Sequence, residues 1–439
     1  MLRTAPNEKN QVTQALSLQA RGSKGGMRHV DLKDLQLGSN GIGRMINRNI
    51  VLHLIRTIQP VSRADVARVS GLQRSTVSQI VDQLLREGWI CEGPNRRTAR
   101  GRRPIMLTLS DAVAILAVDI HPGQAVVAMV DLNGRILSSS TVPVGKDPAR
   151  STKSIVSSLK RLRDSYTSKS LEGIGVSVPG RVNPTTQRLV FAPNLRWGAF
   201  DLKHAIEREM GLTAEIENAA NSALISELWF GRMDGVRNAV LITVSEGIGA
   251  GILADGKLIT GHNGTAGEIG HIPLASGSAL CGCGQVGCWE TLASNRAALG
   301  YYKELVPASD EITFEELIVL AGEGDGNAIE ALERQATFLG KGLRMLAYAF
   351  SPEVVLVTGG LVYAWERFAP IIEKELNNPP LPGSAPRLLP THEGGLARLR
   401  GAAAILLQRH SGANDHRQIT AARKRGSGED STLPAAAEI

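Results

Sequence analysis

The sequence is poor in aromatic residues and in cysteine, and it has no long apolar run. Aromatic residues make up 4% of its 439 residues, and only four residues are cysteine. The longest apolar runs, such as residues 112–118 and 354–357, are far too short to span a bilayer, so no membrane contact is expected. The first residues are basic but contain no continuous apolar stretch, which argues against a secretory signal. We therefore expect a cytoplasmic protein that is not built on disulfide bonds.

Positive charge is concentrated in the first quarter of the chain. Residues 1–110 contain 18 Lys and Arg against 7 Asp and Glu, whereas the whole chain has 49 against 42. The remaining residues are therefore slightly acidic. A basic head on a mildly acidic body suggests that the head binds a polyanion such as nucleic acid, although a solvated basic tail would have the same composition.

Composition and periodicity divide the chain into four segments. Residues 1–44 and 411–439 are polar with weak periodicity, and both are expected to be disordered. Residues 45–110 show the apolar spacing of two helices, a tight turn and a third helix, followed by a β-hairpin. That order predicts a winged helix-turn-helix domain.

The segment 111–410 alternates strand-like and helix-like stretches, which predicts an α/β fold. We expect two lobes with a cleft between them, at about 111–232 and 233–396. The last helix of the segment is expected to return to the first lobe.

The third predicted helix of the head carries polar residues that suit DNA recognition. In a helix-turn-helix this helix lies in the major groove, and the polar residues of its first turns face the base edges. Arg and Gln can form paired hydrogen bonds to guanine and adenine, respectively. The alternative is a small helical module that binds protein. The candidate base-reading residues are Gln73, Arg74, Ser75, Thr76, Ser78 and Gln79.

A basic loop follows that helix. Residues 96–104 contain five arginines and no acidic residue. Such an extended cationic strip can enter the minor groove, whereas an ordinary solvated loop would rarely carry five arginines without an acid. We predict a wing that contacts DNA through Arg100, Arg102 and Arg103. Cys91, just before the wing, is expected to be a small buried packing residue.

The other three cysteines form a cluster with one histidine. Cys281, Cys283 and Cys288 lie within eight residues, and His271 precedes Cys281 by ten. Thiolates and a neutral imidazole are the ligands that zinc prefers, and glycines between them let the backbone fold around one ion. An odd number of cysteines is poorly explained as a disulfide framework. We predict a structural zinc site of all four residues; the alternative is a group of unliganded thiols.

These features together resemble the ROK family (repressors, open reading frames and kinases), and within it the regulators that carry a winged helix before a sugar-kinase-like body. The resemblance covers about residues 45–410. It is most specific in four stretches, namely the winged helix that ends at Gly101–Pro104, Glu217–Asn221, Ser245–Gly251, and Gly267–His271 with the cysteines that follow it.

The resemblance implies an actin/hexokinase-like fold whose two lobes close over a sugar. It also implies which side chains bind the sugar hydroxyls: carboxylates accept paired hydroxyls, and Asn both donates and accepts. His271 would bind zinc through one nitrogen and face the sugar with the other. The alternative for the two glutamates is an exposed loop pair. The implied sugar ligands are Asn194, Asn218, Glu268, His271 and Glu290.

The departures from the kinases of the family concern phosphoryl transfer. Ala219 stands where the kinases have the Asp that acts as general base, and a methyl group accepts no proton. The first phosphate loop of the kinases, Asp-x-Gly-Gly-Thr, is replaced by residues 119–124, in which Pro122 lacks a backbone N–H. Glu246 adds a carboxylate at the second phosphate loop. We therefore expect no catalytic residues and no enzyme activity.

The sequence thus favours a sugar-responsive DNA-binding transcriptional regulator, a repressor, of carbohydrate metabolism genes. Its expected partners are operator DNA, a monosaccharide or sugar-phosphate effector, and further copies of the chain in a homodimer or tetramer. One alternative is an active ROK sugar kinase that phosphorylates a hexose from ATP and has an accessory DNA-binding head. The other is a DNA-binding protein whose body only dimerises.

Overall fold

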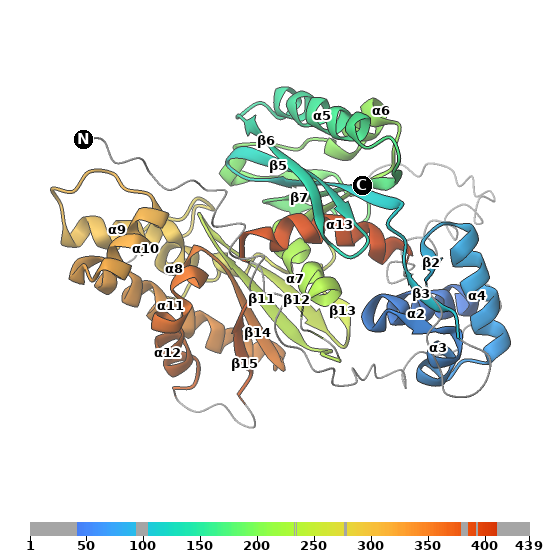
Figure 1. Ribbon diagram of the computed structural model, residues 1–439. Coiled ribbons are helices and arrows are strands. Elements are labelled where there is room, and N and C mark those ends of the chain that lie inside the picture. Colours follow the sequence, from blue (N-terminus) through green and yellow to red (C-terminus); the bar gives the residue numbers. More distant parts are fainter. Residues whose placement is uncertain are drawn as a thin grey trace, which may run out of the picture.

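A computed structural model describes residues 42–93, 104–231, 233, 235–275, 279–378, 385–391 and 394–410. The predicted wing residues Arg100, Arg102 and Arg103, most of segment 1–44 and the segment 411–439 lie outside these described residues. Figure 1 shows a small helical head beside a body built on two sheets, so the predicted mixture of a helix-turn-helix head and an α/β body is confirmed.

The head contains three helices and a small antiparallel sheet of order β1-β3-β2. Ser62 caps the second helix by accepting a hydrogen bond from the Asp65 backbone N–H, and Gly71 ends that helix in the left-handed conformation. The third helix buries an apolar stripe that includes Val77 and Leu84. The elements are α2 (Ile42–Ile58), β1 (Val61–Ser62), α3 (Arg63–Ser70), α4 (Arg74–Arg86), β2 (Ile90–Glu92) and β3 (Met106–Leu109).

Cys91 is exposed, so the prediction of a buried packing residue was wrong. It lies on β2 between Ile90, which is buried, and Glu92, which is exposed. Successive side chains of a strand point to opposite faces, and Ile90 occupies the inward position. The Cys91 sulfur therefore lies on the outer face, 3.1 Å from the Thr108 hydroxyl on the neighbouring strand.

The first sheet of the body has the order β10-β7-β4-β5-β6, with β4, β5 and β6 antiparallel and β10, β7 and β4 parallel. Its core on one face is shared with α5 and α6. The last helix, α13, packs on the other face so closely that a Cβ on Gly175 would lie 1.7 Å from the Ala402 carbonyl. The elements are β4 (Val113–Ile120), β5 (Gly123–Asp131), β6 (Ile136–Val144), α5 (Pro148–Ser165), β7 (Ser170–Val178), β8 (Arg181–Val182), β9 (Leu189–Phe191), η2 (Pro193–Leu195), α6 (Leu202–Met210), β10 (Ala214–Asn218), α7 (Ala219–Phe230) and α13 (Ala397–His410).

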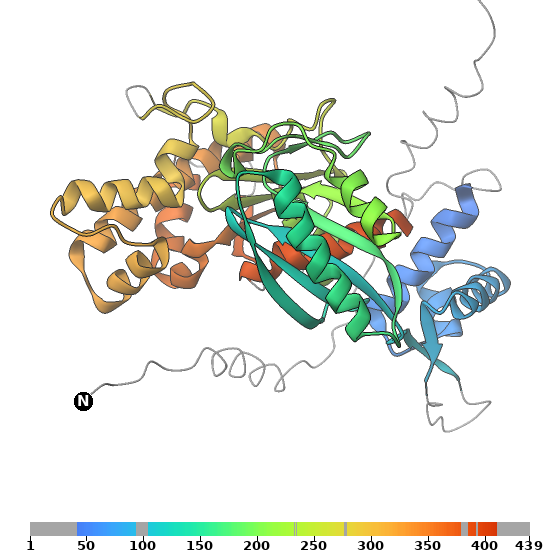
Figure 2. The same ribbon diagram turned by 90° about the horizontal axis from the view of Figure 1, so that it is seen from above.

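The second sheet repeats this pattern in the order β13-β12-β11-β14-β15, with three antiparallel strands followed by parallel ones. Helices α8 to α12 cover one face of it and form the part of the body farthest from the head, as Figures 1 and 2 show. The elements are β11 (Ala239–Val244), β12 (Ile248–Ala254), β13 (Lys257–Leu258), η3 (Ile269–His271), α8 (Glu290–Ala293), α9 (Asn295–Leu305), α10 (Phe314–Glu323), α11 (Gly326–Phe350), β14 (Val354–Gly359), η4 (Gly360–Ala364), α12 (Trp365–Leu376), β15 (Arg387–Pro390) and η5 (Gly394–Leu396).

Two helices, α7 and α13, lie in the middle of the molecule in both ribbon views (Figures 1 and 2). They touch at Gly401, where a Cβ would approach the Ser222 carbonyl to 1.8 Å. Ala397, at the start of α13, packs with Val354 and Leu356 of the second sheet, whereas later residues of α13 pack with the first sheet. Both sheets therefore rest on these helices. None of the described helices combines the length and the apolar character needed to cross a membrane.

Candidate functional site

The four predicted metal ligands meet at one point. One ligand atom from each of His271, Cys281, Cys283 and Cys288 lies within 4.8 Å of all the others. The Cys281 sulfur is 3.4 Å from His271 Nδ1, and the sulfurs of Cys283 and Cys288 are 3.6 Å apart. Ligands at zinc–sulfur and zinc–nitrogen distances of about 2.0–2.3 Å in a tetrahedron are separated by about 3.5 Å, so the donor set and its spacing fit one tetrahedral metal ion.

The same packing disfavours free thiolates in the absence of a cation. Burial raises the pKa of Cys281, and it raises the pKa of Cys288 to about 12. Only the exposed Cys283 has its pKa lowered, chiefly by a hydrogen bond from the Gln285 backbone N–H. A bound cation would supply the positive charge that three adjacent thiolates require.

His271 connects the cysteine cluster to a glutamate of the expected sugar site. Its Nδ1 faces Cys281, whereas its Nε2 lies 3.6 Å from a Glu268 carboxylate oxygen. Burial raises the pKa of Glu268; the charges of His271 and Arg181 oppose that rise and the charge of Glu290 adds to it. Glu268, His271 and Glu290 are therefore close enough for their charges to interact.

Glu290 is fixed in place by three contacts, although it is the first residue of the short helix α8. It is 8% exposed, and one carboxylate oxygen accepts a hydrogen bond of 3.1 Å from the Ile248 backbone N–H. The other oxygen lies 3.2 Å from the Arg296 guanidinium and 3.8 Å from the Cys281 sulfur. The His/Cys₃ cluster and this carboxylate are thus in direct contact.

Gly247 allows Glu290 and Asn194 to approach each other. A Cβ at Gly247 would lie 2.3 Å from a Glu290 carboxylate oxygen and 3.4 Å from Asn194 Nδ2. A side chain at this position would separate the two groups. Asn194 itself is exposed on η2, and its amide and the Glu290 carboxylate both lie beside Gly247. Asn194, Glu268, His271 and Glu290 therefore form one polar group that contains residues from both lobes.

Asn218 has structural contacts of its own at the start of α7. It caps α7, since its Oδ1 accepts hydrogen bonds from the backbone N–H groups of Ala220 and Asn221 at 2.8 and 3.4 Å. Its Nδ2 donates to the Gly180 carbonyl at 2.7 Å. The next residue after Gly180 is Arg181, whose charge acts on Glu268. The segment Gly180–Arg181 therefore contacts Asn218 at one residue and acts on Glu268 at the next. Ala219, the residue after Asn218, is buried.

The first phosphate loop is occupied by an ionic network that the sequence did not predict. Asp119 is 1% exposed, and its two carboxylate oxygens lie 2.8 Å from Arg398 Nη2 and 2.7 Å from His121 Nε2. Arg398 also donates to the Ile120 carbonyl at 2.6 Å, and its Nη1 is 3.3 Å from His121 Nδ1. Asp119, His121 and Arg398 therefore form one network beside the Ile120 carbonyl.

Arg181, Gly247, Arg296 and Arg398 are the site residues that sequence reasoning missed. Arg181 and Arg398 act on residues distant in sequence, and no local motif identifies them. Gly247 lies within the stretch Ser245–Gly251, and Arg296 follows Glu290 by six residues, but neither role was assigned from the sequence.

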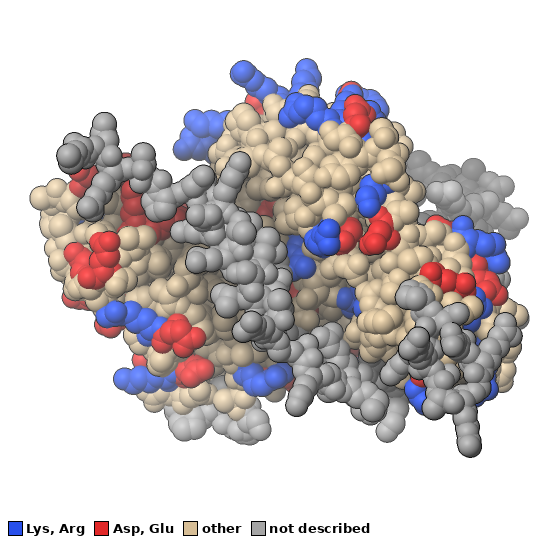
Figure 3. Space-filling view, viewed as in Figure 1, with Lys and Arg blue, Asp and Glu red and all other residues tan. Residues whose placement is uncertain are grey.

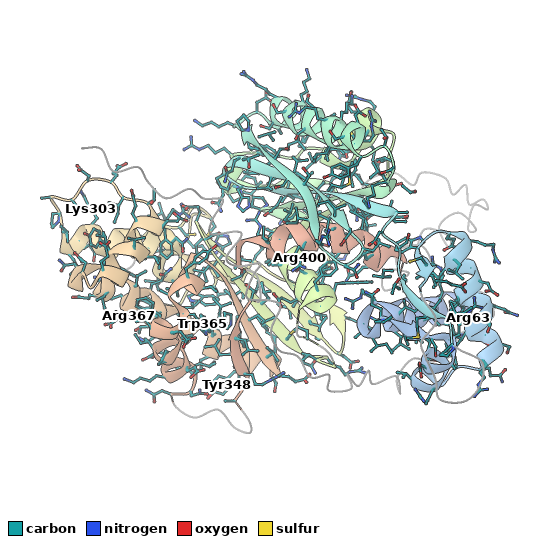
Figure 4. The ribbon with its side chains drawn as sticks, viewed as in Figure 1. Arg63, Lys303, Tyr348, Trp365, Arg367 and Arg400 are labelled. Atoms are coloured by element: carbon teal, nitrogen blue, oxygen red, sulfur yellow. The ribbon has the colours of Figure 1, made fainter. Side chains whose placement is uncertain are left out.

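The exposed face of α4 presents the predicted DNA-reading residues. Gln73, Arg74, Ser75 and Gln79 are exposed, and Thr76 and Ser78 are partly buried. Arg63, labelled in Figure 4, bridges α3 to Asp82 on α4 and Glu92 on β2 at 2.7 and 3.2 Å. These bridges hold α4 against α3 and β2, while the first turn of α4 stays exposed to solvent. On the body, basic side chains also protrude at the top of the view in Figure 3, in the region of α5.

A winged head, a two-sheet body of sugar-kinase type and a His/Cys₃ cluster together define a class of protein. The sequence model of the ROK family matches residues 115–409. The xylose repressor of Caldicellulosiruptor bescii is 29% identical over 357 residues, which cover 78% of this chain and 90% of that protein.

Two solved structures extend the comparison. One is a ROK family transcriptional regulator described as a homologue of the E. coli MLC protein (TM-score 0.73, 25% identity, covering 86% of this chain and all of that one). The other is a ROK family glucokinase from Streptomyces griseus in complex with glucose and AMPPNP (TM-score 0.63, 31% identity, covering 67% of this chain and 99% of that one). The chain belongs to the ROK family, and it matches the xylose repressor and the regulator over nearly their whole length.

Proposed function

We propose that this protein is a repressor that binds operator DNA through its head and changes its DNA affinity when a monosaccharide or sugar phosphate binds between the two sheets. The observation that supports this proposal is that one chain combines an exposed first turn of α4 with the polar group Asn194, Glu268, His271 and Glu290, at positions where the resemblance implies sugar ligands. In this proposal residues 45–110 are the DNA-binding domain, residues 111–410 are the sugar-sensing body, and the protein acts in the cytoplasm.

The sugar would be held by the polar group Asn194, Glu268, His271 and Glu290, with Asn218 contributing at the start of α7. The prior contacts of Glu290 and His271 support this role, because groups held in advance lose little entropy on binding. Arg181 and Arg296 border the glutamates and add donors of hydrogen bonds. A carboxylate can bind two neighbouring hydroxyls, so the set suits a polyol ring.

The metal proposed for the cluster is zinc, held by His271, Cys281, Cys283 and Cys288. Four protein ligands leave no open position, so the ion would stabilise the loop structurally and supply no activated water. Its effect on the sugar would be indirect: with Nδ1 on the metal, His271 keeps Nε2 directed toward Glu268.

We also propose that the body has no kinase activity. Ala219 provides no general base, and Asp119 is already engaged by Arg398 and His121, so its carboxylate is not available to a metal–nucleotide complex. The resemblance to the glucokinase supports the common fold of the body.

The regulator is proposed to act as a homodimer or tetramer. A single winged helix contacts few base pairs, and two-fold symmetric pairs are the common solution. A sugar that changes the arrangement of the lobes would then change the spacing of two heads.

The proposal is tested with the purified full-length chain. A DNA duplex is selected from a random pool by binding, and its affinity is measured by fluorescence anisotropy with and without D-xylose, D-glucose and their phosphates. We expect specific binding in the nanomolar range and a change of at least about 5-fold with one of these sugars. Failure to select any DNA sequence, or sugar-dependent ATP consumption in a coupled assay, would contradict the proposal.

Arg74→Ala is expected to weaken specific DNA binding by about 10-fold or more and to relax sequence preference at one position, because a bidentate contact to a base is worth about 1–3 kcal/mol. The matched control is Arg86→Ala, at the exposed far end of the same helix. Both changes remove one positive charge. Equal weakening by the two variants, without a change in preference, would assign Arg74 to general electrostatic attraction instead.

A further inference from the structure

Helix α7 extends from the sugar-binding side of the body to the DNA-binding head. Its N-terminus is capped by Asn218, and its twelve residues end at Phe230, about 18 Å away at the usual helical rise. Its first nine residues are all buried, so the helix has no solvent face over most of its length. A helix with this environment is surrounded by packed neighbours on every side.

The neighbours of α7 leave it little freedom to bend. On one side Gly401 of α13 touches the Ser222 carbonyl, where a Cβ would be 1.8 Å away. On another, Gly251 of β12 lies against Ala220 and Leu224, with Cβ distances of 2.8 and 2.9 Å to them. Close-packed interiors transmit displacement and do not absorb it. A shift at one end of α7 is therefore expected at the other.

The C-terminal end of α7 contacts the head directly. The Arg56 guanidinium of α2 lies over the Trp229 ring, 4.8 Å from its centroid. The neighbouring Phe230 ring lies 5.3 Å from the Arg400 guanidinium and packs on Gly134, where a Cβ would be 2.7 Å from the ring. Figure 4 labels Arg400 on α13, at the centre of the molecule below the first sheet.

Head and body also share one hydrophobic core. Buried residues of α2 and α4, such as Leu54 and Leu84, belong to the same cluster as Leu406 of α13, and Trp229 and Phe230 pack against that cluster. A hydrogen bond of 2.7 Å from Gln59 Nε2 to Asn133 Oδ1 links the end of α2 to the first sheet. The head thus packs on the body through α7 and its neighbours, so a displacement of α7 changes the interface between head and body.

We propose that α7 is the element that couples the effector site to the DNA-binding head, with Trp229 and Phe230 as the positioning residues at its far end. This inference rests on the proposed function. The Asn218 amide caps α7 through Oδ1 and donates one Nδ2 hydrogen to the Gly180 carbonyl, so its second Nδ2 hydrogen can donate to a sugar hydroxyl. A hydroxyl bonded there shifts the amide that caps α7 and so changes the contacts at the first turn of the helix, and the head then responds through the Arg56–Trp229 contact. The coupling is the difference in free energy between two positions of the head on the body.

The first test perturbs the start of α7 and needs neither sugar nor DNA. Asn218→Ala removes the cap, and hydrogen–deuterium exchange is followed in residues 50–58 of α2. We expect exchange there to rise by about 3-fold or more. The matched control is Asp147→Ala, which removes an equivalent cap from α5: Asp147 Oδ1 accepts from the backbone N–H groups of Ala149 and Arg150 at 2.9 and 3.2 Å. Helix α5 lies on the opposite face of the sheet, so that variant is expected to leave α2 unchanged.

The second test removes the far contact. In a Trp229→Ala background the effect of Asn218→Ala on α2 should disappear, whereas Trp229→Phe, which keeps an aromatic ring beside Arg56, should restore part of it. Trp229→Ala and Trp229→Phe are both checked for folding by near-ultraviolet circular dichroism. The proposal is overturned if Asn218→Ala leaves exchange in α2 unchanged, if Asp147→Ala raises it equally, or if the effect of Asn218→Ala persists in full without the Trp229 ring.

Affinity for the selected DNA separates this inference from the proposed function. If the wild-type chain binds no specific DNA, the proposed function fails, while the exchange experiment still decides whether α7 is coupled to the head. If DNA binding and a response to D-xylose or D-glucose are found, Trp229→Ala is expected to retain sugar binding and to reduce the response of DNA affinity to less than about 2-fold. A full sugar response in that variant would exclude α7 as the coupling element.

Discussion

Replacing Cys288 by serine is expected to remove the bound metal, lower the melting temperature by roughly 10 °C and abolish the sugar response. The temperature shift corresponds to a loss of about 6 kcal/mol in a body of about 300 residues, because the unfolding entropy is about 2.1 cal/mol/K per residue. Structural zinc sites contribute directly to folding, and a serine hydroxyl does not replace a thiolate as a ligand. Metal content by atomic emission and melting by differential scanning fluorimetry measure the two effects.

The large effect is expected because Cys288 belongs to the His/Cys₃ cluster and is bonded directly to a residue of the hydrophobic core. It immediately precedes Trp289, which is fully buried, packs on Gly342 and donates from its indole N–H to the Phe338 carbonyl at 2.9 Å. Glu290 follows directly. Loss of the metal at Cys288 would thus loosen a buried anchor and a proposed sugar ligand together.

Cys91→Ser serves as the control for this experiment. Cys91 is exposed on the head and outside the cluster, so its replacement should change neither metal content nor melting temperature by a measurable amount. A Cys288→Ser protein that still holds one equivalent of zinc would remove Cys288 from the ligand set. A metal-free variant with unchanged melting temperature would show that the metal has no structural role.

The cysteine cluster and the helix-turn-helix could be predicted because their signals are local. Cys281, Cys283 and Cys288 are near one another in sequence, and their glycine spacers leave few ways to arrange them. The apolar stripe of α4 is likewise a short-range pattern. Such patterns depend on geometry within one turn or loop, which the sequence expresses directly.

The network of Asp119, His121 and Arg398 could not be predicted, because Arg398 reaches Asp119 only after α13 has packed against the first sheet. The sequence indicated that the residues of the kinases' first phosphate loop are replaced. It did not indicate the contacts that Asp119 makes with Arg398 and His121. Asn218 illustrates the same limit. Its motif indicated a sugar ligand, whereas its role as the cap of α7 became visible only in the structure. The prediction for Cys91 was wrong because neighbouring residues of a strand face opposite sides, and in the short strand β2 the inward position belongs to Ile90.

The remaining large effect concerns phosphoryl transfer. Any sugar-dependent ATP consumption by the wild-type protein is expected to be at least about 10²–10⁴-fold slower than that of a chain with a positioned base. Ala219→Asp should not restore it. The new carboxylate would lie beside Asn218, but the first phosphate loop would still carry Pro122 without an N–H, and the Asp119 carboxylate would still be engaged by Arg398.

A double variant, Ala219→Asp with Arg398→Ala, tests whether the arginine is the remaining obstacle. Arg400→Ala in the same Ala219→Asp background is the matched control, because Arg400 lies on the same helix but donates to the Gly134 carbonyl at 2.7 Å, away from Asp119. We expect both double variants to remain inactive, since Pro122 persists in each. Activity that appears only with Arg398→Ala would identify Arg398 as the single barrier to nucleotide binding, whereas sugar phosphate formed by the wild-type chain would contradict the proposal of a sensor without catalysis.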